Sequence, residues 1–205
     1  MLKTVLKQLK SHAPFTFAGA VFGVSLALIF RGISHETSYN LFYIFHPLHV
    51  VLSALVTASM YKLHNKKPWK GWKGLTVLLV IGYVGSVGIA TLSDSVVPYI
   101  GETLLKMPDR GIHLGFIEKW WLINPLAILG VLWAYFKPTT KFPHGGHVLL
   151  STWASLFHVL MAKAGVLSFT AAFVIIPFLF IAVWLPCCVS DIVFPLLFVR
   201  EEKIH

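Results

Sequence analysis

Residues 46–53 read HPLHVVLS, and residues 144–151 read HGGHVLLS. The pattern His-x-x-His-Val-x-Leu-Ser therefore occurs twice in a chain of 205 residues. A second pair follows in the same order, because residues 93–98 read SDSVVP and residues 190–195 read SDIVFP. Matches that recur in one order at nearly one spacing indicate an internal repeat. The sequence therefore predicts that one structural unit is present in two copies.

We place the two copies at residues 12–101 and 122–199. A fainter match supports this division, since Pro14 and Gly19 have the same spacing as Pro125 and Gly130. The remaining segments are an amphipathic helix at the membrane surface over residues 1–11, an outer loop over 102–121, and a cytoplasmic tail over 200–205.

The composition is that of a membrane protein. Hydrophobic residues make up 57% of the chain and charged residues 12%, whereas a soluble domain carries about 25% charged residues. Several apolar runs are long enough to cross a bilayer, which takes about 20 residues of helix. We therefore predict an all-α integral membrane protein, located in the cytoplasmic membrane in a prokaryote. Its six transmembrane helices are predicted at residues 14–30, 41–61, 75–98, 120–136, 145–162 and 167–199.

Three spans in each copy have a consequence for topology. Because three is odd, the two copies must cross the membrane in opposite directions, which makes a 3+3 inverted-topology repeat of the kind found in secondary transporters. Most of the 17 Lys and Arg residues then lie on the side that holds both termini, which predicts that the N- and C-termini are cytoplasmic. The net charge of +9 thus reports orientation, and we expect no nucleic-acid partner.

The repeated histidines and serines share a helix face in each copy. His46, His49 and Ser53 are spaced by three and four residues, so they lie on one side of a helix. Pro47 suits the first position of a helix, which predicts that His46 lies near a helix start. The second copy repeats the arrangement with His144, His147 and Ser151 and adds His158. Helix capping by histidine is a structural alternative for His46 and His144.

Each copy also carries an aspartate near the end of its third span. Asp94 and Asp191 lie where the helix dipole is negative and solvation is poor, so a cation or a proton is expected to compensate each one. A proline follows four residues after each acid and cannot donate to its carbonyl. Each motif therefore presents a carboxylate, a freed carbonyl and a hydroxyl, the last from Ser93 or Ser190. Pro177 and Pro186 further predict a kink or break in the last span.

From depth in the membrane we predict two clusters of metal ligands. The outer half holds His46, His49 and Asp94, and Glu102 is near enough to join them; the inner half holds His144, His147 and Asp191, with Cys187 and Cys188 nearby. Imidazole and carboxylate together suit Zn, Fe, Mn, Co or Ni better than Mg or Ca. The ion pathway is predicted to include Ser53, Ser93, Ser151, Ser190, Glu102 and His158.

These features favour a small transporter or channel that moves a divalent transition-metal cation. Two alternatives stay open: a membrane-embedded metal-dependent enzyme acting on a lipid or isoprenoid, and an electron-transfer protein with haem held by His49 and either His147 or His158. A structural or scaffold protein is a further alternative. The absence of a Gly-rich phosphate loop argues against transport driven by ATP. Six short spans leave little room for an enclosed pathway, so we expect a homodimer.

Overall fold

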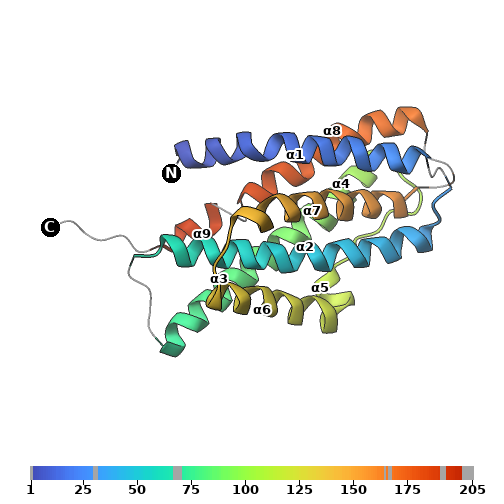
Figure 1. The fold of residues 1–205 in the computed structure, drawn as a ribbon. Helices are drawn as coiled ribbons and strands as arrows, with labels where there is room; N and C mark the ends of the chain where they lie inside the picture. The colour runs from blue at the N-terminus through green and yellow to red at the C-terminus, as the bar shows by residue number, and fades with distance from the viewer. Residues whose placement is uncertain are drawn as a thin grey trace.

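The structure is a computed structural model, and it describes residues 2–29, 32–66, 71–163, 165, 168–189 and 193–199. The described chain is mostly helical and contains no strand, so the all-α prediction is confirmed (Figure 1). The elements are α1 (Leu2–Ile29), α2 (His35–His64), α3 (Gly71–Thr91), the π-helical turn η1 (Leu92–Val96), α4 (Val97–Leu104), α5 (Gly115–Glu118), α6 (Trp120–Phe136), α7 (Lys141–Met161), α8 (Phe169–Cys188) and α9 (Phe194–Leu197).

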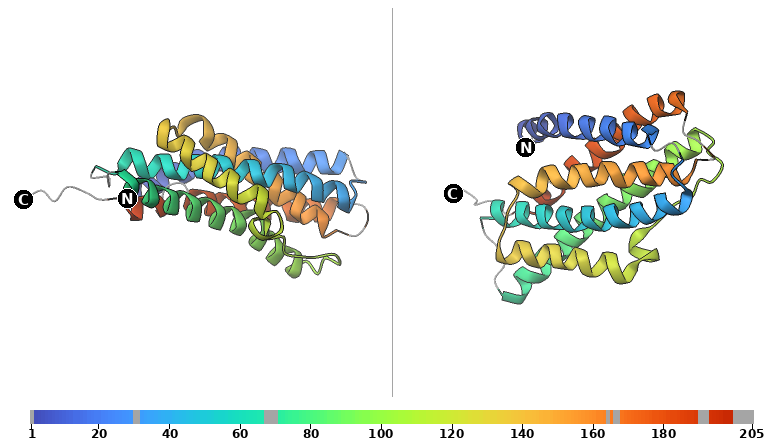
Figure 2. Two further views of the ribbon diagram at one scale, coloured as in Figure 1. Left: turned by 90° about the horizontal axis from the view of Figure 1, so that it is seen from below. Right: turned by 45° about the vertical axis from the view of Figure 1, so that its right-hand side comes forward.

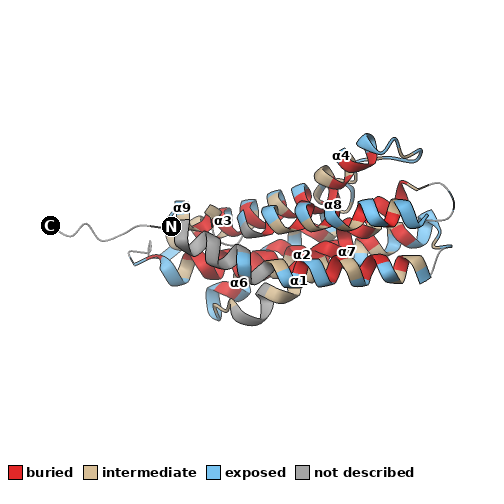
Figure 3. Ribbon diagram, turned by 90° about the horizontal axis from the view of Figure 1, so that it is seen from above, coloured by how far each residue is buried: buried red, intermediate tan, exposed pale blue. Residues whose placement is uncertain are grey.

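Three of the described helices are long and apolar enough to cross a bilayer: His35–His64, Gly71–Leu104 and Phe169–Cys187. Two shorter apolar helices, Ala13–Ile29 and Trp120–Phe136, accompany them. The outward faces of these helices carry large apolar side chains, among them Phe17, Leu129 and Phe173. Buried and exposed residues alternate along each helix in Figure 3. An apolar exterior around buried serines, histidines and acids is the pattern of a chain solvated by lipid.

Helix α2 begins earlier than the sequence predicts. Ser34 caps its first turn, since the Ser34 side chain accepts a hydrogen bond from the Thr37 amide at 3.1 Å. Glu36 in the first turn is also favourable at the positive end of the helix dipole. The placement of Pro47 at a helix start is therefore wrong, because Pro47 lies inside α2 and His46 lies well within the helix.

The third span is also longer than predicted. The sequence ends it at Pro98, but Pro98 lies in the first turn of α4, where a missing N–H is tolerated. The chain reaches α4 through η1, in which the Val97 amide bonds to the Leu92 carbonyl, one residue further back than in an α-helix. Glu102 consequently lies on the buried face of a helix and not in the outer loop, which begins after Leu104.

Prolines elsewhere do not interrupt their helices. Helix α1 runs through Pro14, so residues 2–11 do not form a helix separate from the first span. Helix α8 likewise runs through Pro177 and Pro186, so the break predicted there is absent within Phe169–Cys188. Val189 and Val193, which follow α8 and precede α9, are π-helical like η1.

Helices α2 and α7 lie side by side at the centre of the bundle and run in opposite directions (Figures 1 and 2). The His35 ring contacts the Met161 carbonyl at 3.0 Å, and the Thr139 amide donates to Ser59 Oγ at 3.0 Å, so the start of each helix meets the end of the other. We call the two ends of the bundle the His35 end and the His64 end. Helix α1 packs on α7 and α8, whereas α6 packs on α2 and α3.

Candidate metal centre

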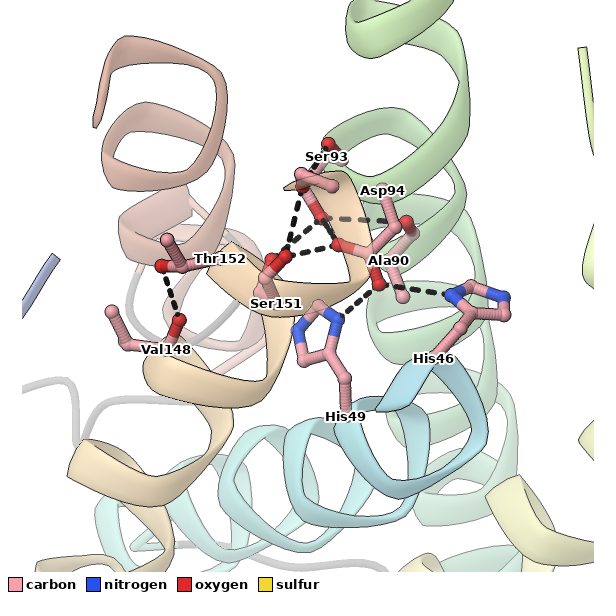
Figure 4. A network of polar contacts seen from close by, with 9 residues as sticks. His46, His49, Ala90, Ser93, Asp94, Val148, Ser151 and Thr152 are labelled. Carbon is pink, nitrogen blue, oxygen red and sulfur yellow. Dashed lines mark hydrogen bonds and ion pairs between the residues drawn. The ribbon is translucent and has the colours of Figure 1, made fainter. Parts of the chain in front are cut away.

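A fully buried carboxylate lies at the contact between α2, η1 and α7. Asp94 Oδ2 accepts hydrogen bonds from His46 Nδ1 at 2.9 Å and from His49 Nδ1 at 2.7 Å (Figure 4). The two histidines reach one oxygen because residues three apart share a helix face. All three side chains are exposed by no more than 1%.

The other carboxylate oxygen is held by two serines. Asp94 Oδ1 accepts from Ser93 Oγ and from Ser151 Oγ, each at 2.7 Å. Ser155, one turn after Ser151, donates to the Ser93 carbonyl at 2.9 Å and so ties α7 to η1. Asp94 therefore receives hydrogen bonds from both repeated sequence motifs, since Ser151 belongs to the motif at residues 144–151 and the histidines to the motif at residues 46–53.

These contacts select the tautomers of the two imidazoles. An ionised carboxylate only accepts, so both Nδ1 atoms are donors and both Nε2 atoms carry the lone pair when the rings are neutral. His46 Nε2 is buried and has no hydrogen-bond partner within the described chain. The His46 ring is held flat against Phe42, with ring centroids 5.1 Å apart and an angle of 7°. A Cβ atom at Gly115 would lie 2.6 Å from His46 Nε2, so only glycine fits there without moving the ring.

A second donor group shares one histidine with the first. His49 stacks on His147, with ring centroids 5.7 Å apart and an angle of 13° between the rings. Donor atoms of His49, His147 and the buried Cys187 all lie within 4.8 Å of one another, as do those of His46, His49 and Asp94. Ligands around one tetrahedral Zn²⁺ are about 3–4 Å apart. In the first group, one Asp94 oxygen already lies 2.9 and 2.7 Å from the Nδ1 atoms of His46 and His49.

The donor set fits a transition metal. Imidazole, carboxylate and thiolate together suit Zn²⁺ and its neighbours, while Mg²⁺ and Ca²⁺ prefer oxygen ligands alone. The geometry does not favour haem held between His49 and His147, because the two rings are stacked in direct contact and leave no space for a porphyrin between them.

Glu102 and His158 form a separate buried pair. Glu102 Oε1 and His158 Nδ1 are 2.7 Å apart, and both side chains are exposed by 1% or less. The His158 ring packs edge-on against Phe42 and against His113 of the outer loop, with centroid distances of 5.5 and 5.4 Å. Phe42 thus contacts the rings of both His46 and His158.

Of the remaining predicted site residues, only Ser53 has a side chain that the structure describes, and it is buried in α2. The side chains of His144 and Cys188, together with Ser190 and Asp191, lie outside the described residues.

Three residues of the site were not predicted. Ser155 follows Ser151 by one helical turn, and that spacing identifies it in retrospect. Gly115 and His113 come from the loop, where no periodic pattern marks them.

No protein-family model, curated protein or solved structure matches the chain. The function is therefore argued from the geometry of the site.

Proposed function

We propose that the protein is a small membrane transporter or channel that moves a divalent transition-metal cation through the Asp94 centre. The observation that carries the proposal is the pair of buried donor groups that share His49. An ionised carboxylate at zero exposure is costly unless positive charge compensates it. A cation bound between Asp94 and the two imidazoles supplies that charge once the Nδ1 protons of the rings have moved to Nε2, which frees the Nδ1 lone pairs.

The donors succeed one another along the bundle, as a pathway requires. Helix α7 runs from the His64 end to the His35 end, so His147 lies toward the former and His158 toward the latter. Their eleven-residue separation in sequence spans about 16 Å of helix, roughly half the thickness of the hydrocarbon core. Cys187, near the end of α8, adds a thiol to the donors at the level of His49 and His147. A purely structural metal needs one closed set of ligands, not a series.

Two inverted three-helix units explain this arrangement. In the proposed repeat, α1, α2 and α3 correspond to α6, α7 and α8. Equivalent residues meet each other only near a two-fold axis, and the equivalent residues His49 and His147 are in ring contact. The packing of α1 on α7 and α8 has its counterpart in the packing of α6 on α2 and α3. Under this proposal α1, α2, α3 with α4, α6, α7 and α8 make six membrane spans.

We propose that the His64 end faces the cytoplasm. Helix α1 begins at that end, and α9 lies there as well (Figure 1). Lys62 and Lys137 are at this end, where Lys62 donates to the Tyr135 carbonyl. Lysine-rich loops on one side are the usual sign of the cytoplasmic face.

The test is uptake of Zn²⁺ or Mn²⁺ into liposomes that contain the purified full-length protein and a metal-sensitive dye. His49→Gln removes the histidine common to both donor groups, and we expect the initial rate to fall at least about tenfold. His64→Gln is the matched control, because His64 lies at the end of α2 and its ring bonds only locally, to the Met60 carbonyl at 2.9 Å.

Uptake by His49→Gln at the wild-type rate would contradict the proposed site. If liposomes that contain the wild-type protein take up no more metal than liposomes without protein, the proposed transport is contradicted. Metal that co-purifies with such a protein would then favour the enzyme alternative.

A further inference from the structure

We infer that Glu102 and His158 form a proton-binding site, separate from the metal centre and accessible from the His35 end. In the proposed transporter, on which this role depends, the site exchanges protons as the cation moves. The pair shares a short contact of 2.7 Å, and neither side chain is exposed by more than 1%. A glutamate and a histidine that share one proton are neutral as a pair, which is the form that burial favours.

The pair has unused capacity for protons. Glu102 Oε2 and His158 Nε2 are both buried and have no hydrogen-bond partner among the residues that the structure describes. Oε2 can accept a proton, and Nε2 can accept or donate one according to the tautomer. Both atoms lie outside the Asp94 hydrogen bonds, so the pair can change its protonation without breaking them.

The groups that face the pair connect it to the surface. Helix α2 contributes Phe42, and Phe178 of α8 packs on α4 at Gly101. The outer loop contributes His113, whose ring lies edge-on to His158. Other titratable or charged groups lie further out, around His113: Glu118 at 3.3 Å from its Nδ1, Tyr39 against its ring, and Lys119 over Tyr39.

Exposure rises along this series. His113 and Glu118 are exposed by 23% and 34%, whereas Glu102 and His158 are buried. A proton that enters at Glu118 can therefore pass to His113 and then to His158. Rotation of the His113 ring toward His158 Nε2 provides that transfer, as histidine commonly does in proton relays.

Coupling to the metal centre follows from the position of Glu102 in the chain. Glu102 lies eight residues after Asp94 on the continuous path of η1 and α4, about 12 Å along the helix axis. At an effective dielectric constant of about 20, a unit charge gained at one site changes the affinity of the other site for a singly charged ion by about tenfold at that distance. A proton bound at Glu102 therefore weakens cation binding at Asp94. The two sites are also in indirect contact, because the Phe42 ring packs against both the His46 ring and the His158 ring.

The experiment measures protons in two ways. Infrared difference spectra of the purified full-length protein between pH 5 and pH 8 should show the carbonyl band of a buried protonated carboxyl, absent in Glu102→Gln and shifted in Glu102→Asp. Glutamine can still accept the His158 hydrogen bond, so the fold is expected to survive. In liposomes with a pH-sensitive dye, Glu102→Gln should lower the number of protons moved per Zn²⁺ at least about fivefold. Asp109→Asn, which changes an exposed acid in the outer loop that follows α4, is the matched control.

Each outcome decides a different statement. A wild-type spectrum without the band, or a band that persists in Glu102→Gln, overturns the proton site. An unchanged number of protons per Zn²⁺ in Glu102→Gln overturns it as well. The band in wild-type protein that transports no Zn²⁺ supports the proton site and contradicts only the proposed transport.

Discussion

Substitution of Asp94 by asparagine gives the most direct test of the metal centre. Asparagine has nearly the same shape as aspartate, so the change removes charge with little effect on packing. Its carbonyl oxygen can keep the two hydrogen bonds from His46 and His49. Its amide nitrogen then faces Ser93 and Ser151, whose hydroxyls must turn from donating to accepting.

The magnitude follows from these contacts. Hydrogen bonds to a charged group contribute about 1.5–3 kcal/mol and those between neutral groups about 1 kcal/mol. The two imidazole bonds therefore weaken by about 2 kcal/mol in total, and we expect the protein to remain folded. Residues that only support a ligand change metal affinity by about 10–100-fold. The loss of a charged ligand should therefore lower Zn²⁺ affinity at least about 100-fold, or about 2.7 kcal/mol.

Equilibrium dialysis of the detergent-solubilised protein against Zn²⁺, with elemental analysis of the retained metal, measures this change. Circular dichroism reports whether helix content is preserved. Asp109→Asn removes an exposed carboxylate and should leave Zn²⁺ affinity unchanged. If folded Asp94→Asn binds Zn²⁺ within about threefold of wild type, the buried carboxylate is not a ligand and the reasoning fails.

Three further predictions concern the surroundings of this carboxylate. Ser151→Ala should lower Zn²⁺ affinity about 10–100-fold, whereas Thr152→Val, which removes only a local bond to the backbone of α7 (Figure 4), should change it less than threefold; equal effects in dialysis would contradict the role of Ser151. Gly115→Ala should displace an imidazole and lower affinity, while Gly88→Ala, which meets open space, should not; matching affinities would show that the ring can move freely. Cys187→Ser should lower affinity for Cd²⁺ more than for Mn²⁺, because thiolate favours soft ions, and competition dialysis that finds equal losses would exclude the thiol from the site.

The central contacts were accessible from sequence because they depend on helical spacing. His46 and His49 share a face at any helix boundary, and the estimated depth of Asp94 matches theirs. The predicted start of α2 was wrong because residues 34–40 are mostly polar, and hydropathy alone assigns a polar stretch to a loop. Ser34 as a cap and Glu36 in the first turn are the signals that correct it.

The pairing of Glu102 with His158 was beyond the reach of sequence. It depends on α4, which continues the third span past a proline that hydropathy takes as its end. The π-helical turn η1 precedes that proline and changes which residues face α7. A turn of this kind has no strong local pattern, and Glu102 was therefore placed near the first metal cluster instead of beside His158.

The positions at which the two proposed copies carry different residues bear on the direction of the proposed transport. Alignment of the two copies on their shared motifs pairs Glu102 with Val199, His158 with Met60, and Cys187 with Ala90. A symmetrical pathway would bind the cation equally well from either side. Among the described residues, the buried Glu102–His158 pair lies toward the His35 end, and the Cys187 thiol lies beside His49 and His147. In the proposed transporter, the Glu102–His158 pair on one side of the shared histidines and the thiol beside them make the two approaches to the centre chemically different.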